Sequence, residues 1–191
     1  MNERGHTLLE IVLVIALILI ASSMLIPGLR AYSQETQLMG AAQVFRGRFR
    51  EAQTIAVRRG VETAIRFEVL PTGTYYSLYV DGNHNGVLKV DIDRSLDQRI
   101  EGPLRLDAGS AGVRVGINAG VPAIPPDSGT LDPSDPIRFG RSNMLSFSPM
   151  GTATPGTFYL AGESAQAAVR VTPGTARVRI MFCRGRRWVD R

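Results

Sequence analysis

The chain is poor in the residues that build disulfides, metal centres and hydrolytic sites. Cys183 is its only cysteine, and His6 and His84 are its only histidines, among 191 residues. One cysteine excludes an intrachain disulfide. One cysteine and two histidines are also too few to form a zinc site with cysteine or histidine ligands. The same shortage leaves no Ser–His–Asp or Cys–His arrangement. We therefore predict that the protein is not an enzyme and has no resident cofactor.

Lysine is almost absent as well, because Lys89 is the only one among 22 basic residues. The other cations are guanidinium groups, which pair with carboxylates and phosphates through two parallel hydrogen bonds. Their distribution is uneven: residues 28–60 carry a net charge of +4 and the last fifteen residues +5, whereas residues 61–176 carry −3. The basic character of the chain therefore lies in one N-terminal segment and at the C-terminal end.

The N-terminus contains a long apolar run. Residues 11–21 include no polar side chain, and the segment from Thr7 to Ile26 is twenty residues long. As a helix it would extend over about 30 Å, the thickness of the hydrocarbon core of a bilayer. Glu10 interrupts it near its start, although a carboxylate there costs about 2.5–3.5 kcal/mol unless it has a partner. We predict a membrane helix over residues 6–27 in which Glu10 has a specific role.

Two simpler interpretations of this run are a secretory signal peptide and a plain anchor. A signal peptide also has a basic start and an apolar stretch, and Ala21-Ser22-Ser23 is a weak cleavage site. The mature chain would then be a secreted β-rich module that begins after Ser23. An acidic residue inside the apolar region is unusual for a signal peptide and has no purpose in a plain anchor. Beyond Ser23 the sequence continues in helical register, which also argues against cleavage there.

Gly5-His6-Thr7-Leu8-Leu9-Glu10 resembles the type III signal of type IV prepilins, in which a short polar leader ends in Gly and is usually followed by Phe, Thr, Leu, Leu and Glu. The resemblance implies that residues 1–5 are a leader, that a prepilin peptidase cleaves after Gly5, and that this enzyme N-methylates His6. Glu10 and Pro27 both match the family motif. The resemblance further implies a single-pass protein of a bacterial inner membrane, with its head in the periplasm.

Cleavage after Gly5 would place a cationic amine four residues before the Glu10 carboxylate, with both in apolar surroundings. In a staggered bundle of helices, the amine of one subunit can meet Glu10 of its neighbour. An unpaired buried charge is strongly destabilising, so this pair would select the correct axial register. We therefore predict that the partners are other pilins or pseudopilins in a filament.

A second apolar pattern continues the helix beyond the membrane segment. Pro27-Gly28 predicts a bend or a local melting of the helix. Beyond it, a stripe at three-to-four spacing predicts an amphipathic helix over residues 28–60 that ends at Gly60. The stripe consists of Leu38, Ala41, Ala42, Phe45, Phe49, Ala52, Ile55 and Ala56. The arginines of this segment lie mostly off the stripe. They form either a solvated face, which we prefer, or a surface for anionic headgroups or acidic neighbours.

From Val61 the pattern changes to the alternation of β-strands, which predicts a β-rich head over residues 61–182. The predicted strands are 63–69, 75–80, 104–106, 113–117, 137–139, 144–147, 157–160, 167–172 and 177–182. Residues 120–135 are rich in Pro, Gly, Ser and Asp, and we predict a mobile loop there. Several short strands against one long helix make an α+β arrangement.

Three features of the head resemble the GspH/FimT pseudopilin domain. They are Phe147-Ser148-Pro149-Met150-Gly151, the later Pro155-Gly156-Thr157-Phe158, and a basic Arg-x-Arg near the end of the chain. The resemblance covers most of residues 40–182 and implies a type IV pilin-like fold. It also implies a minor, filament-tip component of a type II secretion system or of a type IV pilus.

One loop of the head matches the first half of a calcium-binding motif, in which alternating oxygens converge on a hard cation. Its candidate ligands are Asp81, Asn83, Asn85 and Asp91. The second half of the motif fails, because Ile92 occupies the place of the bidentate Glu. The alternatives are therefore a calcium site and an Asx-rich turn, of which we prefer the turn.

Residues 183–191 are predicted to form a basic C-terminal tail. Together with the strand before it, this end of the chain holds cations and an aromatic ring suited to phosphate contacts and base stacking. The candidate DNA-binding residues are Arg177, Arg179, Arg184, Arg186, Arg187 and Trp188. Some FimT-type minor pilins bind DNA through a C-terminal Gly-Arg-x-Arg motif, and here Ala176 stands where that Gly would be. The alternative, which we prefer, is a tail that aids solubility or contacts partners.

The leading hypothesis is thus a minor pseudopilin that assembles through its N-terminal helix into the tip of a type II secretion pseudopilus and supports protein secretion. The second hypothesis is a FimT-like minor type IV pilin that binds DNA during natural transformation.

Overall fold

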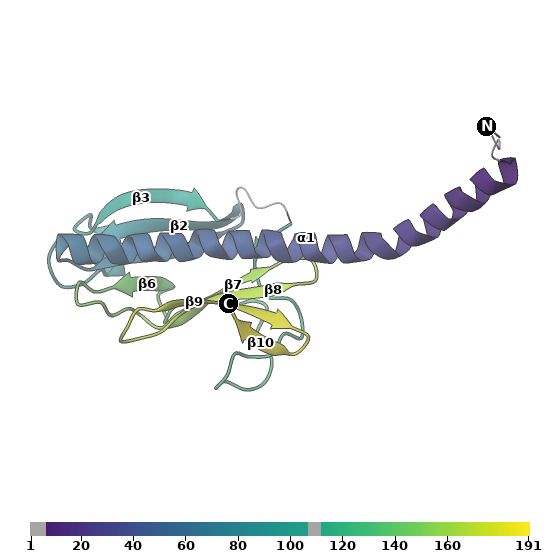
Figure 1. Ribbon diagram of the computed structural model, residues 1–191. Helices are drawn as coiled ribbons and strands as arrows, with labels where there is room; N and C mark the ends of the chain where they lie inside the picture. The colour runs from purple at the N-terminus through teal and green to yellow at the C-terminus, as the bar shows by residue number, and fades with distance from the viewer. Residues whose placement is uncertain (1–6, 107–111) are drawn as a thin grey trace.

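The fold is one long helix that lies across two antiparallel sheets (Figure 1). This computed structural model describes residues 7–106 and 112–191, and between 24 and 31 it describes the backbone only. The predicted cleavage site, Gly5 and His6, therefore lies outside the described residues. The combination of a helix with antiparallel sheets confirms the predicted α+β class.

Helix α1 extends from Leu8 to Arg59, close to the predicted bounds. It begins after Thr7, whose hydroxyl oxygen accepts the backbone N–H of Glu10 at 3.4 Å, a contact typical of helix N-caps. It ends at Gly60, whose φ of 68° is left-handed and whose N–H donates to the Ala56 carbonyl at 2.9 Å. Glycine is favoured there because it has no Cβ to clash, and the predicted helix end is confirmed.

For Pro27-Gly28 the sequence predicted either a bend or a local melting of the helix. The backbone stays helical through both residues, which excludes melting. The N-terminal end of the helix curves away from the axis of the rest (Figure 1), because a helix can absorb the lost donor and the steric clash of proline by bending. Among the described residues, no helix is both long enough and apolar enough to cross a membrane. The membrane-spanning half of α1 stays a prediction.

The head consists of a four-stranded and a six-stranded sheet. The first has the order β3-β2-β1-β6; the second has the order β10-β9-β8-β7-β4, with β5 also paired to β7. The strands of the first sheet are β1 (Thr63–Leu70), β2 (Gly73–Val80), β3 (Gln98–Arg105) and β6 (Met144–Phe147). The strands of the second sheet are β4 (Arg114–Val115), β5 (Ile137–Arg138), β7 (Gly156–Ala161), β8 (Gln166–Val171), β9 (Val178–Arg184) and β10 (Arg187–Asp190). Every predicted strand overlaps one of these, whereas β10 and the short helix α2 (Lys89–Asp93) lie outside the predictions.

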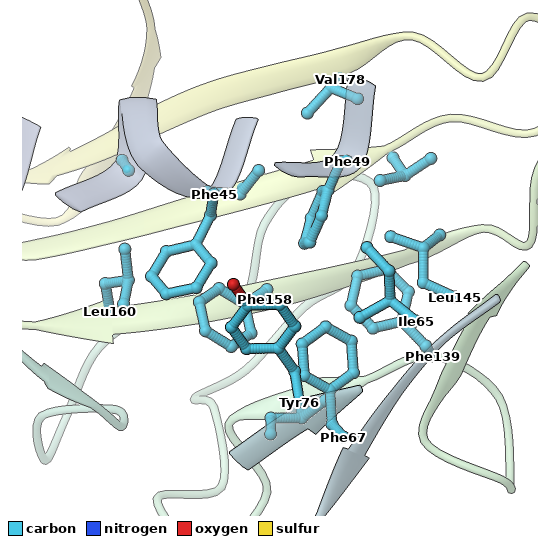
Figure 2. Packing of buried hydrophobic residues seen from close by; sticks show 14 of the residues in the cluster. Phe45, Phe49, Ile65, Phe67, Tyr76, Phe139, Leu145, Phe158, Leu160 and Val178 are labelled. Carbon is cyan, nitrogen blue, oxygen red and sulfur yellow. The ribbon is translucent and has the colours of Figure 1, made fainter. Parts of the chain in front are cut away.

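The apolar stripe of α1 packs against both sheets. Phe45 and Phe49 project from the helix toward Phe158 of β7 (Figure 2), with ring centroids 4.7 and 6.4 Å from it. Phe67 of β1 stacks on Phe158 at 5.5 Å and on Phe139 at 5.6 Å. One aromatic cluster therefore joins the helix to both sheets. All stripe residues are buried except Ile55, which is partly buried, and the predicted stripe is confirmed.

The segment 120–135 is irregular, as predicted for a loop, but three of its side chains are packed against the head. Val121, Ile124 and Leu131 are buried in a second apolar cluster together with Tyr159 and Met181. Because neighbouring residues of a strand point to opposite faces, Tyr159 lies on the face of the sheet away from Phe158 and α1. The sequence did not predict this packing, because these apolar residues follow no regular period and stand among Pro, Gly and Asp.

Candidate functional site

The N-terminal end of α1 extends beyond the head (Figure 1). Eleven large apolar side chains between Leu8 and Ile20 are 49–81% exposed. Soluble monomers rarely expose contiguous apolar surfaces of this size, and such surfaces mark sites of interaction with proteins or membranes. This segment is therefore the first candidate site.

Glu10 lies in the first turn of this segment and is exposed. It is the only charged side chain between Arg4 and Arg30, and the positive end of the helix dipole favours a carboxylate there. A cation on a neighbouring chain can thus reach it. The role of Glu10 in register stays a prediction, as do those of Gly5 and His6, outside the described residues, and of Pro27, whose side chain is not described.

The loop after β2 is organised by the buried carboxylate of Asp81. Its Oδ1 accepts the backbone N–H groups of Asn83 at 3.0 Å and His84 at 2.8 Å, and its Oδ2 accepts the N–H of Gly86 at 2.8 Å. Short polar side chains form such contacts with the backbone two or three residues ahead in Asx turns. Both carboxylate oxygens of Asp81 are therefore engaged by the loop itself.

Two further buried carboxylates accept hydrogen bonds from the same loop. Asp91 accepts the side-chain amides of Asn83 at 3.3 Å and Asn85 at 2.9 Å. Asp97, which sequence reasoning missed, accepts the backbone N–H of Gly82 at 3.1 Å. In the described part of the chain, no three Asp, Glu, His or Cys side chains are grouped to hold a metal ion. The geometry favours the Asx-rich turn, and calcium stays a sequence-based prediction that a thermal-stability titration tests.

The predicted C-terminal tail is instead a strand hairpin, because β10 pairs antiparallel with β9. Trp188 is half-buried, and its indole N–H donates to the carbonyl oxygen of Pro122 at 2.8 Å. The indole ring lies 6.1 Å from the ring of Tyr159, whose pKa is raised by burial. Trp188 therefore packs against the head and is not a freely exposed ring.

Several arginines of the C-terminal end are neutralised by carboxylates. Arg179 forms an ion pair with Asp190, and this hydrogen bond raises the pKa of the Arg179 guanidinium. Arg184 and Arg191 both form ion pairs with Glu35 of α1. These contacts hold the C-terminal hairpin against the helix.

The remaining arginines of the predicted DNA-binding set have no ion pair among the described residues. Arg177 precedes β9, whereas Arg186 and Arg187 lie at the turn between β9 and β10. The seven residues of β9 separate these positions by roughly 20 Å. The structure therefore does not bring the predicted set together into one surface.

A long helix that lies across antiparallel sheets and projects an uncovered apolar end is consistent with the class of type IV pilin-like proteins. The family model described as type II transport protein GspH matches residues 41–175, from the packed half of α1 to the turn before β9. The chain belongs to this family. Membership implies the general role of a type II secretion pseudopilin, a structural protein that associates with other pseudopilins in a filament. Comparisons with curated proteins and with solved structures found no match.

Proposed function

We propose that this chain is a minor pseudopilin that enters the tip of a type II secretion pseudopilus and supports protein secretion across the outer membrane. The observation that carries the proposal is the exposed apolar end of α1, which projects beyond the packed head (Figure 1). Before assembly, the lipid of the bacterial inner membrane would cover this end, with the head in the periplasm. After assembly, the helices of neighbouring subunits would cover it.

The exposed side chains are sufficient to hold the helix in a bilayer despite Glu10. Leu, Ile and Val each contribute about −0.3 to −0.6 kcal/mol to insertion at the centre of a helix. The eleven exposed side chains therefore contribute about −3 to −7 kcal/mol. A carboxylate costs about 2.5–3.5 kcal/mol at the centre of the membrane and less near its edge, where Glu10 would lie. Insertion stays favourable, and Glu10 is retained at a moderate cost.

Glu10 would set the axial register of the subunit in the filament. Cleavage after Gly5 by a prepilin peptidase would expose the amine of His6, which the same enzyme would methylate without removing its charge. Glu10 of one subunit would then neutralise this amine on its neighbour. Pro27 would let the helix bend where it leaves the apolar bundle.

The substitution Glu10→Ala tests this role. Breaking a buried ion pair by removing one partner costs about 3–5 kcal/mol, so we expect incorporation into pseudopili to fall by at least tenfold. Insertion into the inner membrane should be unchanged, because the substitution makes the segment more apolar. Immunoblots of sheared filaments and of the membrane fraction measure the two quantities separately.

Glu51→Ala is the matched control, because Glu51 is an exposed carboxylate on the same helix that pairs with Arg48. It should enter filaments as the parent chain does. Normal incorporation of Glu10→Ala would contradict the proposed role of Glu10. An intact leader on the membrane-extracted chain, seen by mass spectrometry in cells with an active prepilin peptidase, would contradict the whole proposal.

DNA binding by a FimT-like minor pilin is the second candidate. It is favoured by Arg186 and Arg187 at the β9–β10 turn, which are exposed and form no ion pair with any residue that the structure describes. The half-buried Trp188 weakens it. Binding of an oligonucleotide that falls steeply with salt and is lost in an Arg186→Gln, Arg187→Gln chain would support this candidate. Absence of binding at low salt would exclude it.

A further inference from the structure

A hollow of about 550 Å³ lies between the packed half of α1 and the C-terminal hairpin. Five of its ten lining residues are arginines: Arg46 and Arg50 from α1, Arg177 and Arg179 at the start of β9, and Arg191 at the end of the chain. Asp190 carries the only side-chain carboxylate among the lining residues. The hollow therefore concentrates positive charge that the sequence distributes over two distant segments.

Two of the five arginines are neutralised within the chain. Arg179 pairs with Asp190, and Arg191 pairs with Glu35 at 3.2 Å. These pairs engage the side chain of Asp190 and that of Glu35, which lies outside the lining. No other side-chain carboxylate lines the hollow.

The other three arginines have no carboxylate partner in the described ranges 7–106 and 112–191. Arg46 donates to the side-chain amide oxygen of Gln43, which carries no charge. Arg50 and Arg177 are exposed to solvent. Cations gathered around a concave surface raise the local potential and attract anions. This hollow is therefore suited to an anionic ligand.

We propose that this hollow binds the carboxylates of an acidic segment of a neighbouring subunit. Guanidinium groups hold carboxylates through paired, charge-assisted hydrogen bonds, and here α1 supplies them from one side and the start of β9 from the other. The volume accommodates several side chains of a peptide and exceeds what a single small anion would fill. The identification of the partner as a filament subunit rests on the proposed function, whereas the carboxylate chemistry does not.

Two other sources of anions fit the hollow less well. Arg46 lies twenty residues beyond Ile26, or about 30 Å along a helix, so on an inserted chain the hollow lies beyond the lipid headgroups. None of the ten lining residues is aromatic, so nucleic-acid bases have no ring on which to stack. The observations favour an acidic peptide.

The test is binding of a fluorescein-labelled hexaglutamate peptide to the full chain in detergent, followed by fluorescence anisotropy at low and at high salt. We expect the peptide to bind at low salt and to be released as salt increases. In an Arg50→Gln, Arg177→Gln chain, the affinity should fall by about tenfold or more, because two unpaired guanidinium groups are removed. Thermal unfolding of the variant confirms that it is folded.

Arg58→Gln, Arg59→Gln is the matched control, because both arginines lie exposed in the last turn of α1 and outside the hollow. It removes the same charge and should bind hexaglutamate within about twofold of the parent chain. Equal losses in the two variants, or no binding at low salt, would overturn the proposal. Tighter binding of an oligothymidine of equal charge, dependent on Arg50 and Arg177, would overturn it in favour of nucleic acid.

Failure of this proposal is distinguishable from failure of the proposed function. The Glu10→Ala chain retains the hollow and should bind hexaglutamate as the parent chain does, whatever its incorporation into filaments. Inorganic phosphate at the same low salt should displace the peptide only weakly, because one small anion cannot engage all the guanidinium groups together. If phosphate displaces the peptide when both supply the same concentration of negative charge, the hollow is a site for free phosphate. This result would contradict the proposal that it binds an acidic peptide.

Discussion

Asp81, Asp91 and Asp97 illustrate how buried carboxylates can organise a loop through its own donors. Each of the three residues is only 3–6% exposed, and burial of a charge is costly unless hydrogen bonds compensate it. Here the compensating donors are backbone and amide N–H groups of the loop itself. No side-chain nitrogen or oxygen that is buried in the described part of the chain lacks a hydrogen-bond partner. The loop and its carboxylates therefore stabilise each other.

Replacement of Asp81 by Ala should lower the free energy of unfolding by about 2–3 kcal/mol, since backbone N–H groups in a part-buried site lose their acceptor. Thermal unfolding of the full chain in detergent, followed by circular dichroism, measures the loss.

Asp132→Ala is the control for this substitution. Asp132 also accepts hydrogen bonds from its own loop, from the backbone N–H and hydroxyl of Ser134, and these bonds lower the pKa of Asp132. Because Asp132 is exposed, water can replace it, and the substitution should leave the stability almost unchanged. Equal losses at the two positions would contradict an organising role of Asp81.

At the scale of elements, the β9–β10 hairpin attaches the C-terminal end of the chain to the head. Its Trp188 packs beside Tyr159, and the indole N–H donates a hydrogen bond to the carbonyl oxygen of Pro122 in segment 120–135. Its ion pairs with Glu35 attach it to α1. The hairpin is therefore a structural part of the head.

Trp188→Ala should cost about 2 kcal/mol, less than the 3–5 kcal/mol of a fully buried Trp because the side chain is half-exposed. The substitution should also make segment 120–135 a site of cleavage by subtilisin, since its cover is lost. Val189→Ala, on the same strand but 47% exposed, should have a much smaller effect. Resistance of segment 120–135 in the Trp188→Ala chain would show that the loop packs independently of the hairpin.

At the scale of the whole molecule, the two ends of α1 differ in what surrounds their apolar side chains. The apolar stripe is buried in the head from Leu38 onward, and side chains from Leu8 to Ile20 are exposed. One helix thus belongs to the core of the head at one end and to a membrane or a filament, as we propose, at the other.

Deletion of residues 1–31 should therefore yield a soluble, folded head that no longer sediments with membranes. Within the segment removed, none of the side chains that the structure describes, those of residues 7–23, belongs to the core cluster, whereas Glu35 and the stripe are retained. Size-exclusion chromatography and circular dichroism measure solubility and fold.

Deletion of residues 1–45 is the comparison for this truncation. It also removes Leu38, Ala41, Ala42 and Phe45 from the core cluster, and it should give an unfolded or aggregated product because loss of one buried Phe alone costs about 3–5 kcal/mol. An aggregated product from the shorter deletion, 1–31, would contradict the division of α1 into two parts.

Local patterns in the sequence predict much of the fold. The end of α1 at Gly60, the stripe through Phe45 and Phe49, and the approximate positions of most strands follow from short-range periodicity and turn chemistry, and the structure confirms them. Strand β3 is the exception, because the predicted strand 104–106 covers only its last two residues. The packing of segment 120–135 and the presence of β10 do not follow, because their apolar residues have no regular period. Asp97 lies sixteen residues after Asp81, and no local signal links the two before the chain folds.

By itself the sequence determined the class of the protein: an apolar run with one carboxylate, an amphipathic continuation and alternating strands leave few folds that could bury their surfaces. These patterns repeat every few residues, so they can be recognised in the sequence without knowledge of the tertiary structure. Only the tertiary structure decided which charges meet. It paired Arg179 with Asp190 and both Arg184 and Arg191 with Glu35, and it brought Arg177, Arg179 and Arg191 together with Arg46 and Arg50 around one hollow. Such encounters depend on how distant segments pack and not on their spacing along the chain.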